Sequence, residues 1–343
     1  MTAAMVDVRS DTVTRPTPEM LQAMLGAPVG DDVLGEDETV NALQREAAEL
    51  FGKEAALFCP SGTMTNQIGI KVHTRPGDEV ICHELAHIYL YEGGGIASNS
   101  GASVRLLKGG NGRFTAAQVQ ESINRRDDAH LPWTRLVAIE DTVNKGGGCC
   151  WDIEEIARIR AVCAEHGLAL HLDGARLFNA LVARKEAPRD YGRLCDTVSV
   201  CLSKGLGAPA GSLLLGSREL IARGHRYRKM MGGGMRQAGY LAAAGRYALQ
   251  HHVERLTQDH TRAKLLETEL LALPYVESVL PVETNIVIFN LNDSLTSEAF
   301  LQKMRERGVL ASQMGRHTIR FVFHLDVGDT HLEMLRSALR KLN

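Results

Sequence analysis

The sequence has no run of apolar residues that approaches the roughly 18 needed for a transmembrane helix. It also has no block of one charge: Lys and Arg number 39 and Asp and Glu 41, which leaves a formal net charge of −2. This balance argues against a protein that binds nucleic acid or a membrane surface. The first residues, MTAAMVDVRSD, have neither a basic region nor an apolar core, so no secretory signal is expected.

The sequence lacks the cysteine pattern of a disulfide-stabilised protein. Its seven cysteines are odd in number, and most lie in apolar strand or helix patterns. We therefore expect reduced, partly buried thiols in a cytoplasmic enzyme. The adjacent Cys149 and Cys150 could form a redox pair, but a bridge between neighbours requires strained geometry. Internal repeats, low-complexity tracts and disordered linkers are absent as well.

Short apolar runs alternate with helical patterns from about residue 20 to residue 250. This alternation predicts βαβ units and hence an α/β fold with a mostly parallel central sheet. The helical spacing of Ile153–His166 ends at Gly167, a residue suited to a left-handed cap. The expected strands are Ala55–Cys59, Glu79–Cys82, Val104–Leu107, Leu136–Glu140, Leu168–Leu172, Val198–Leu202 and Ser212–Leu215.

A second, smaller domain is expected after a long helical stretch. That stretch runs from about Arg236 to Leu273 and stops at Pro274. The strand patterns Asn285–Asn290 and Thr318–Phe323 and the helix Ser297–Arg307 then indicate a compact α+β unit. We expect a large domain over residues 1–250, whose segment 1–18 contributes to the active site, and a small domain over 251–343.

Two charged residues follow apolar runs in the predicted sheet. Asp173 follows Leu168–Leu172, and Lys204 follows Thr197–Leu202. Ligands bind beyond the carboxyl ends of parallel strands, so both side chains should enter one crevice. Pyridoxal phosphate (PLP) needs such a pair, a carboxylate on its ring nitrogen and a lysine for a Schiff base. The alternatives are an ion pair of Asp173 with Arg176 and a solvated lysine in a loop.

The segment CPSGTMTNQ at 59–67 follows a predicted strand and opens a predicted helix. Backbone N–H groups near Ser61, Gly62 and Thr63 would point at one spot, and a helix start of this kind favours an anion such as a phosphate. The segment is not a Walker P-loop, which requires a Gly-Lys-Ser/Thr ending. The alternative is an ordinary helix cap.

The segment HELAH at 83–87 matches the zincin motif, in which two histidines one helical turn apart bind zinc. It follows a strand, however, and the glycines at 93–95 limit any helix to roughly two turns. The sequence shows no third ligand nearby, so we expect no metal. His87 is better explained as an aromatic side chain lying on a planar cofactor, with a surface histidine as the alternative.

Three arginines are candidate anion ligands. Arg176, three residues after Asp173, would present its planar fork to a carboxylate or a ring oxygen. Arg236 follows a glycine turn at a helix start, which suits a phosphate or carboxylate contact unless the side chain is simply solvated. Arg320 lies within a strand alternation, where a charge needs a partner, and a substrate carboxylate is one candidate.

Together these residues resemble the low-specificity L-threonine aldolases, which belong to the fold-type I PLP-dependent enzymes. The similarity runs through nearly the whole chain. Its landmarks are VRSDTVTRPT at 8–17, VGDDVLGED at 29–37, HLDGARLFNA at 171–180, CLSKGLGAPAGSLL at 201–214, MMGGGMRQAGYLAAAG at 230–245 and HLDV at 324–327.

The resemblance implies a role for each candidate residue. Lys204 would form the Schiff base, His87 would stack on the ring, and Asp173 would contact the ring nitrogen. The phosphate would be held by residues of the anion loop and by an arginine of a neighbouring subunit, namely Ser61, Gly62, Thr63 and Arg236. The substrate carboxylate would be held by Ser10, Arg176 and Arg320. The resemblance also implies helices on both faces of the sheet and a homodimer or homotetramer with shared sites.

The implied reaction is the retro-aldol cleavage of L-threonine, L-allo-threonine or a related β-hydroxy-α-amino acid to glycine and an aldehyde. Within the same apparatus, a β-eliminating lyase or an amino-acid racemase is the alternative. A non-catalytic PLP carrier or regulator is a rival from another class, against which the lack of a basic patch or DNA-binding appendage counts. An assay for aldehyde release would distinguish the aldolase from these alternatives.

The chain departs from the family at two positions. A tyrosine is usual where this chain has Leu34, and a histidine is usual where it has Val143. Both family residues lie near the β-substituent, so their loss changes how the substrate hydroxyl is handled. His87, a water molecule or Asp141 would then act as the base, and we favour His87. We expect a pocket that accepts a bulkier or less polar β-substituent than a methyl group.

Overall fold

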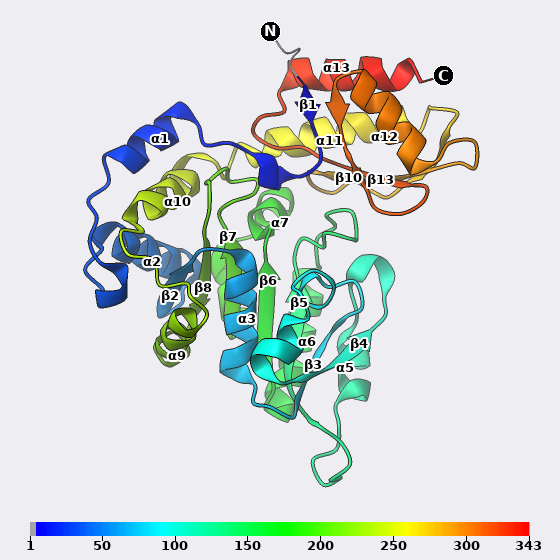
Figure 1. The fold of residues 1–343 in the computed structure, drawn as a ribbon. Coiled ribbons are helices and arrows are strands. Elements are labelled where there is room, and N and C mark those ends of the chain that lie inside the picture. The colour runs from blue at the N-terminus through cyan, green and yellow to red at the C-terminus, as the bar shows by residue number, and fades with distance from the viewer. Residues whose placement is uncertain (1–4, 343) are drawn as a thin grey trace.

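The computed structural model describes residues 5–342 and contains a seven-stranded sheet with a smaller sheet beyond one edge (Figure 1). All neighbouring strands of the large sheet are parallel except those that pair with β8, which confirms the predicted α/β fold. In spatial order its strands are β2 (Ala55–Cys59), β8 (Ser212–Gly216), β7 (Thr197–Cys201), β6 (Ala169–Gly174), β5 (Trp133–Glu140), β3 (Asp78–His83) and β4 (Ser103–Leu107).

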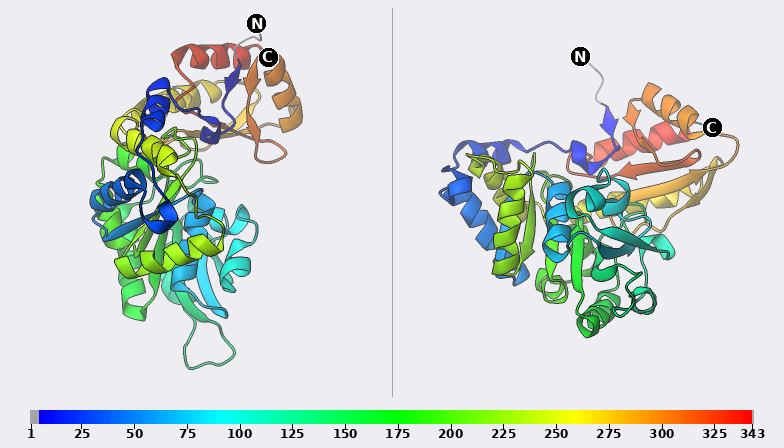
Figure 2. Two further views of the ribbon diagram at one scale, coloured as in Figure 1. Left: turned by 60° about the vertical axis from the view of Figure 1, so that its left-hand side comes forward. Right: turned by 60° about the horizontal axis from the view of Figure 1, so that its bottom comes forward.

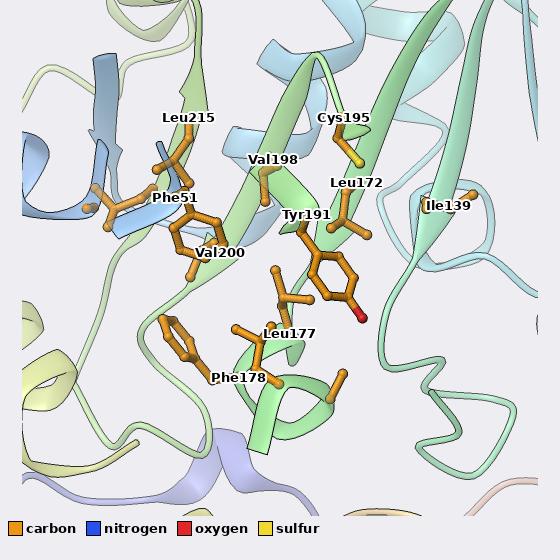
Figure 3. Close-up of a cluster of buried hydrophobic side chains, with 14 of the residues drawn as sticks. Phe51, Ile139, Leu172, Leu177, Phe178, Tyr191, Cys195, Val198, Val200 and Leu215 are labelled. Carbon is orange, nitrogen blue, oxygen red and sulfur yellow. The ribbon is translucent and has the colours of Figure 1, made fainter. Parts of the chain in front are cut away.

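Helices cover both faces of this sheet because successive strand residues point to opposite sides. Phe58 of β2 belongs to the core that one face of the sheet shares with α2, α6 and α8, whereas its neighbour Leu57 belongs to a core on the other face with Ile68 of α3 and Ile221 of α9. Figure 3 shows aromatic and aliphatic side chains filling the first of these cores. The helices before the smaller sheet are α1 (Pro18–Leu25), α2 (Glu38–Phe51), α3 (Gly62–His73), α4 (His87–Leu90), α5 (Ala116–Ser122), α6 (Ile153–His166), α7 (Leu177–Arg184), α8 (Pro188–Leu194), α9 (Arg218–Met230) and α10 (Gly239–His251).

The predicted element boundaries hold to within a few residues. Strand Ala55–Cys59 and helix Ile153–His166 are confirmed residue for residue, and Gly167 takes the left-handed conformation with φ 63°. Strand β6 extends two residues beyond the expected Leu172, so Asp173 lies inside the strand rather than after it. Strand β7 ends at Cys201, which leaves Lys204 in the following turn.

The single helical stretch expected over 236–273 is wrong, because the chain forms two helices there, α10 and α11 (Leu256–Leu270). The interruption coincides with a contact to the large sheet's loops: the Nδ1 atom of His252 lies 2.7 Å from the carbonyl oxygen of Leu206. Residue 250, the expected domain boundary, lies just before this break. The division into domains at that point remains a proposal.

The smaller sheet is antiparallel and has the order β12-β13-β10-β9. It packs against α11, and its core includes Phe289, Phe300 and Phe321. The remaining elements of this unit are β9 (Val276–Val279), β10 (Ile286–Leu291), α12 (Ser297–Glu306), β11 (Val309–Leu310), β12 (Ser312–Gln313), β13 (Thr318–Val322) and α13 (Asp329–Arg340).

The first strand of the chain, β1 (Val6–Asp7), belongs structurally with this second unit. It pairs in parallel with β11, and Val6 and Val8 are buried in the core of the smaller unit. Both views of Figure 2 show β1 in blue beside the orange C-terminal elements. Residues 1–4 and 343, the extreme ends of the two expected domains, lie outside the described residues.

The carboxyl ends of β5, β6 and β7 point toward the smaller unit (Figure 1). The loops after these strands are therefore enclosed between two structural units, where ligand sites of parallel sheets form. Within residues 5–342, no helix combines the length and apolar character needed to cross a membrane.

Candidate active site

Asp173 is the penultimate residue of β6, and only 1% of its surface is exposed. Its Oδ2 atom accepts a hydrogen bond from Nδ2 of Asn66 at 2.9 Å, and its Oδ1 atom accepts one from the backbone of Ala175 at 3.1 Å. Asp173 makes no ion pair with Arg176, which bonds elsewhere, so that alternative is wrong. Asp173 is thus a buried carboxylate at the sheet edge, held by neutral donors.

His87 lies beside Asp173 at the start of α4. Its Nδ1 atom is 3.0 Å from Oε1 of Glu92, and its backbone N–H donates to Oε2 of Glu140 at 2.8 Å. Burial alone would lower the pKa of His87, but the hydrogen bond to Glu92 and the charge of Asp173 raise it above its ordinary value. One oxygen each from Asp173 and Glu92 and one ring nitrogen of His87 lie within 4.8 Å of one another.

Glu92 and Glu140 are two site residues that sequence reasoning missed. The side chain of Glu92 is fully buried and accepts hydrogen bonds from Asn66 and Gln67 in addition to His87. Burial and the neighbouring charge of Asp173 raise the pKa of Glu140 to about 7. Neither glutamate lies in a motif whose spacing alone predicts a site.

The HELAH segment is not one helix. His83 is the last residue of β3, where its Nδ1 atom accepts from the backbone of Leu85 at 3.0 Å and its Nε2 atom lies 3.3 Å from the carbonyl oxygen of Gly109. His87 begins the four-residue helix α4. The two imidazoles therefore lack the shared helix face on which a zincin depends.

Arg176 at the start of α7 forms a buried ion pair with Asp11, another residue that sequence reasoning missed. The guanidinium donates to both carboxylate oxygens, at 2.7 and 2.8 Å. Burial opposes ionisation of Asp11, but the charges of Arg176 and Lys204 lower its pKa to about 2. Lys204 lies in the turn that follows β7, the strand that pairs with β6.

Arg320 projects from β13 toward the same region. It donates to Oδ1 of Asn144 at 2.8 Å and to the carbonyl oxygen of Arg9 at 3.1 Å. Burial and then the nearby charge of Arg176 lower the pKa of Arg320. Its buried Nε atom has no hydrogen-bond partner among residues 5–342. Arg320 thus keeps a buried donor without a partner among these residues, which suits a carboxylate ligand.

Ser10 caps the short helix Asp11–Val13, and its Oγ atom accepts from the backbone of Thr12 at 3.2 Å. Segment 9–12 therefore contacts Arg176 through Asp11 and Arg320 through the Arg9 carbonyl. The structure brings Ser10, Arg176 and Arg320 to one side of the carboxyl edge.

The anion loop has the expected form. Ser61 caps α3 by accepting from the backbone of Met64, and α3 begins at Gly62. A side chain at Gly62 would meet the hydroxyl of Ser212 at 3.5 Å, and that buried hydroxyl has no partner in the described chain. The exposed Thr63 lies at the same helix start. Bare backbone donors and an unpaired hydroxyl here suit a phosphate.

Arg236, unlike the other candidate arginines, has an exposed side chain that is paired at the surface of the subunit. Its guanidinium pairs with Asp31 at 2.9 Å, and 55% of the side chain is exposed. Leu34, in the same loop as Asp31, is 69% exposed. Both side chains face outward from the subunit.

Val143 is buried, with only 1% of its surface exposed, and belongs to the core of the large unit. A side chain at Gly112 would approach the Cγ1 atom of Val143 to 2.4 Å, so the Val143 side chain packs directly against the Gly112 backbone. Its neighbour Asn144 reaches Arg320. In a single chain, Val143 therefore faces the core rather than the open site.

All seven cysteines are buried and free, including the adjacent Cys149 and Cys150. Burial raises the pKa of the Cys149 thiol to about 12, and it raises that of Cys150 as well. Thiols in this state are poor nucleophiles, which does not favour the redox-pair alternative.

The fold and this site define the class of the protein: it has the architecture of the fold-type I PLP-dependent enzymes. A solved threonine aldolase of Leishmania major superposes with a TM-score of 0.85 at 22% identity, over 98% of this chain and 99% of that one. The Escherichia coli protein YbdL, identified as a methionine aminotransferase, superposes with a TM-score of 0.76 at 16% identity, over 98% of this chain and 93% of that one. The fold is thus shared by enzymes of different reactions.

Sequence comparison narrows the class to one family. The model of the Beta-eliminating lyase family matches residues 7–294. The low specificity L-threonine aldolase of Escherichia coli K12 is 43% identical over 96% of both chains. A probable low-specificity L-threonine aldolase of Arabidopsis thaliana is 40% identical over 98% of this chain and 97% of its own length. The chain belongs to the β-eliminating lyase family, in the branch of the low-specificity L-threonine aldolases.

Proposed function

We propose that this protein is a PLP-dependent aldehyde-lyase that cleaves L-threonine, L-allo-threonine or a related β-hydroxy-α-amino acid to glycine and an aldehyde. One observation carries the proposal: Asp173 and His87 lie together at the carboxyl edge of the sheet, with Lys204 in the turn after the adjacent strand β7, in a chain that is 43% identical to a low specificity L-threonine aldolase.

The residues present fit PLP. Lys204 supplies the amine for a Schiff base, Asp173 the carboxylate for the ring nitrogen, and His87 an aromatic face. The start of α3 offers the phosphate site through Ser61, Gly62 and Thr63. When bound there, PLP supplies an electron sink for bond cleavage at the substrate α-carbon.

Arg176 and Arg320 bind the substrate carboxylate in this proposal, with Ser10 beside them. Asp11 holds Arg176 in place through two hydrogen bonds. A rigidly held carboxylate fixes which bond at the α-carbon aligns with the electron sink, and that alignment selects the reaction.

His87 is our proposed base for the β-hydroxyl proton. Its Nδ1 atom faces Glu92, which leaves Nε2 free to accept a proton. Asp141 does not serve instead, because it is fully buried and bonded to Tyr191 and to the backbone of Trp151. A water molecule remains the alternative.

We propose that subunits share their sites. Arg236 is too outward-facing to act in its own chain and would reach a neighbour's phosphate. Large apolar side chains are exposed on α1, on its following loop, at the end of α9 and on α10, an arrangement typical of subunit interfaces. They are Leu21, Leu25, Leu34, Met230 and Tyr240. The free, buried cysteines support a cytoplasmic location.

A panel of β-hydroxy-α-amino acids, assayed for aldehyde release, tests the function. We expect glycine and acetaldehyde from threonine in the wild-type protein and no release in Lys204→Ala. Keto acid and ammonia would instead indicate a β-eliminating lyase, and an altered α-carbon configuration alone would indicate a racemase.

The same panel tests the β-substituent. Because Leu34 replaces a polar tyrosine and is exposed for contact with a neighbouring subunit, we expect phenylserine to be cleaved with a higher kcat/KM than threonine. Leu34→Tyr should shift the ratio toward threonine. A wild-type preference for threonine would contradict the proposal.

A further inference from the structure

A line of hydrogen-bonded side chains runs behind Asp173, between α3 and the sheet. Nδ2 of Asn66 lies 2.9 Å from Asp173, and Oδ1 of Asn66 lies 3.2 Å from Nε2 of His171. Nδ1 of His171 lies 2.9 Å from the hydroxyl of Thr197, and that hydroxyl lies 3.0 Å from Nε2 of His73. Asn66, His171 and Thr197 are at most 2% exposed.

The chemistry of the groups fixes the direction of every bond in this line. The amide nitrogen of Asn66 faces two carboxylates, Asp173 and Glu92, which in their ionised form only accept. Its amide oxygen must then accept from Nε2–H of His171. Burial lowers the pKa of His171 to about 4, so the ring is neutral and its Nδ1 atom accepts from Thr197.

The last link follows in the same way. The oxygen of Thr197, whose proton is directed at His171, accepts from Nε2–H of His73. Burial lowers the pKa of His73 to about 4 as well, despite the opposing charge of Asp196. Each group therefore donates toward Asp173, and reversing any one bond would leave two acceptors or two donors facing each other.

We propose that Asn66 and the line of His171, Thr197 and His73 behind it are positioning residues that act through Asp173. The inference rests on the proposed PLP function. Donors aimed at a carboxylate favour its ionised form, so the proton it shares with a ring nitrogen stays on the ring. A protonated ring is the stronger electron sink.

Asn66 also connects the two sides of the cofactor site. Its second amide hydrogen points to Oε1 of Glu92 at 2.8 Å, and the same oxygen faces Nδ1 of His87 at 3.0 Å. One amide therefore orients both the carboxylate for the ring nitrogen and the carboxylate that holds the stacking histidine. Its substitution should disturb both contacts.

Close packing fixes the line in place. A side chain at Gly69 of α3 would meet Cε1 of His171 at 2.5 Å, so the imidazole occupies the space that a glycine leaves. Gln67 donates to Glu92 and packs as closely against Gly95. A side chain at Gly95 would meet the amide carbon of Gln67 at 2.5 Å. A larger residue at either glycine would therefore displace one of these side chains.

Thr197 offers the sharpest test, because valine has the same shape without the hydroxyl. We would load each variant with PLP and measure, without substrate, the dissociation constant and the pH midpoint of the visible band of the Lys204-linked cofactor. In Thr197→Val the midpoint should rise by about half a pH unit or more, since a less firmly protonated ring withdraws fewer electrons from the linkage nitrogen. Asn66→Ala should shift it further and weaken PLP binding about tenfold or more.

Two matched variants serve as controls. Thr197→Ser keeps the hydroxyl and should keep the wild-type midpoint. Ser199→Ala removes a buried hydroxyl of the same strand, bonded to Thr65 at 2.7 Å and outside the line, and should also leave the midpoint unchanged. Melting temperatures of the cofactor-free proteins report any loss of stability separately.

The inference is overturned if Thr197→Val and Asn66→Ala lower the melting temperature but leave the midpoint and PLP affinity at wild-type values. The line would then have a structural role alone. A wild-type protein that forms no visible band with PLP overturns the proposed function itself, and this inference with it.

Discussion

Tyr191 has one hydroxyl proton but two carboxylate neighbours. Its Oη atom lies 2.7 Å from Glu186 and 3.2 Å from Asp141. Burial raises the pKa of Asp141 to about 8, so the Asp141 carboxyl is mostly protonated at neutral pH. This protonated acid lies directly after Glu140 of the candidate active site.

A raised carboxyl pKa makes stability depend on pH. The unfolded chain releases the Asp141 proton near pH 4 and the folded chain near pH 8, so this residue's contribution falls as pH rises through that window. We expect Asp141→Asn to gain melting temperature relative to wild type between about pH 5 and about pH 8. Parallel pH curves for the two proteins would refute the assignment, and Tyr191→Phe serves as a control for loss of the shared bond.

The pKa of Asp11 is shifted in the opposite direction, so the contribution of Asp11 to stability changes with pH in the opposite sense. Its pKa of about 2 means that its stabilising effect is present above about pH 4 and is lost as pH falls toward 2. Asp11→Asn leaves Arg176 buried without a counter-charge and should cost about 3 kcal/mol or more near pH 7. The difference in melting temperature from wild type should shrink on acidification, and the KM for substrate should rise because Arg176 loses its orientation.

At the scale of elements, helix α3 must satisfy several constraints at once. It begins at the anion loop and carries Asn66 on its inner face, and its approach to the sheet depends on Gly69. Alanine favours a helix over glycine by about 1 kcal/mol, but here the added methyl would overlap His171. The steric effect should decide the outcome.

We therefore expect Gly69→Ala to destabilise the protein by about 1–3 kcal/mol and to weaken PLP binding. Gly224→Ala in α9 is the comparison, because the atom nearest to an added side chain there, Cγ2 of Ile68, lies at 3.2 Å rather than 2.5 Å. Equal melting temperatures for the two variants would show that α3 moves away at no cost.

Most elements were predictable because strands and helices leave local periodic patterns. Asp173 and Lys204 were predictable too, since each lies near the end of an apolar run. Asp11 was not, because its partner Arg176 is 165 positions away and no local pattern encodes the pairing. Asn66, within an ordinary helical pattern, was missed for the same reason, and the break between α10 and α11 depends on a tertiary contact of His252.

At the scale of the whole molecule, the outward direction of Arg236 predicts a particular behaviour of mixed oligomers. Lys204→Ala and Arg236→Ala should each lose most activity on their own. A mixed dimer places both substitutions in one site and leaves the other site intact. Random mixing should restore about a quarter of the wild-type sites.

Co-refolding the two variants and assaying aldehyde release checks this prediction. Recovery well above the sum of the separate variants supports a shared site. Activity no greater than that sum, in a sample shown by a different affinity tag on each variant to contain mixed dimers, would place Arg236 outside the site.

The pairing of β1 with β11 has a consequence for how the protein is made. The segment that carries Ser10 and Asp11 follows a strand whose partner lies about 300 residues later in the chain. During synthesis this segment remains unpaired while the intervening residues, which form the large sheet, are translated and fold. A ribosome-bound chain ending before Val309 should therefore contain a folded sheet but bind no substrate carboxylate. Asp11 is already translated in such a chain, but without β11 it is not held beside Arg176. The enzyme becomes competent only after the segment around Val309 has been translated.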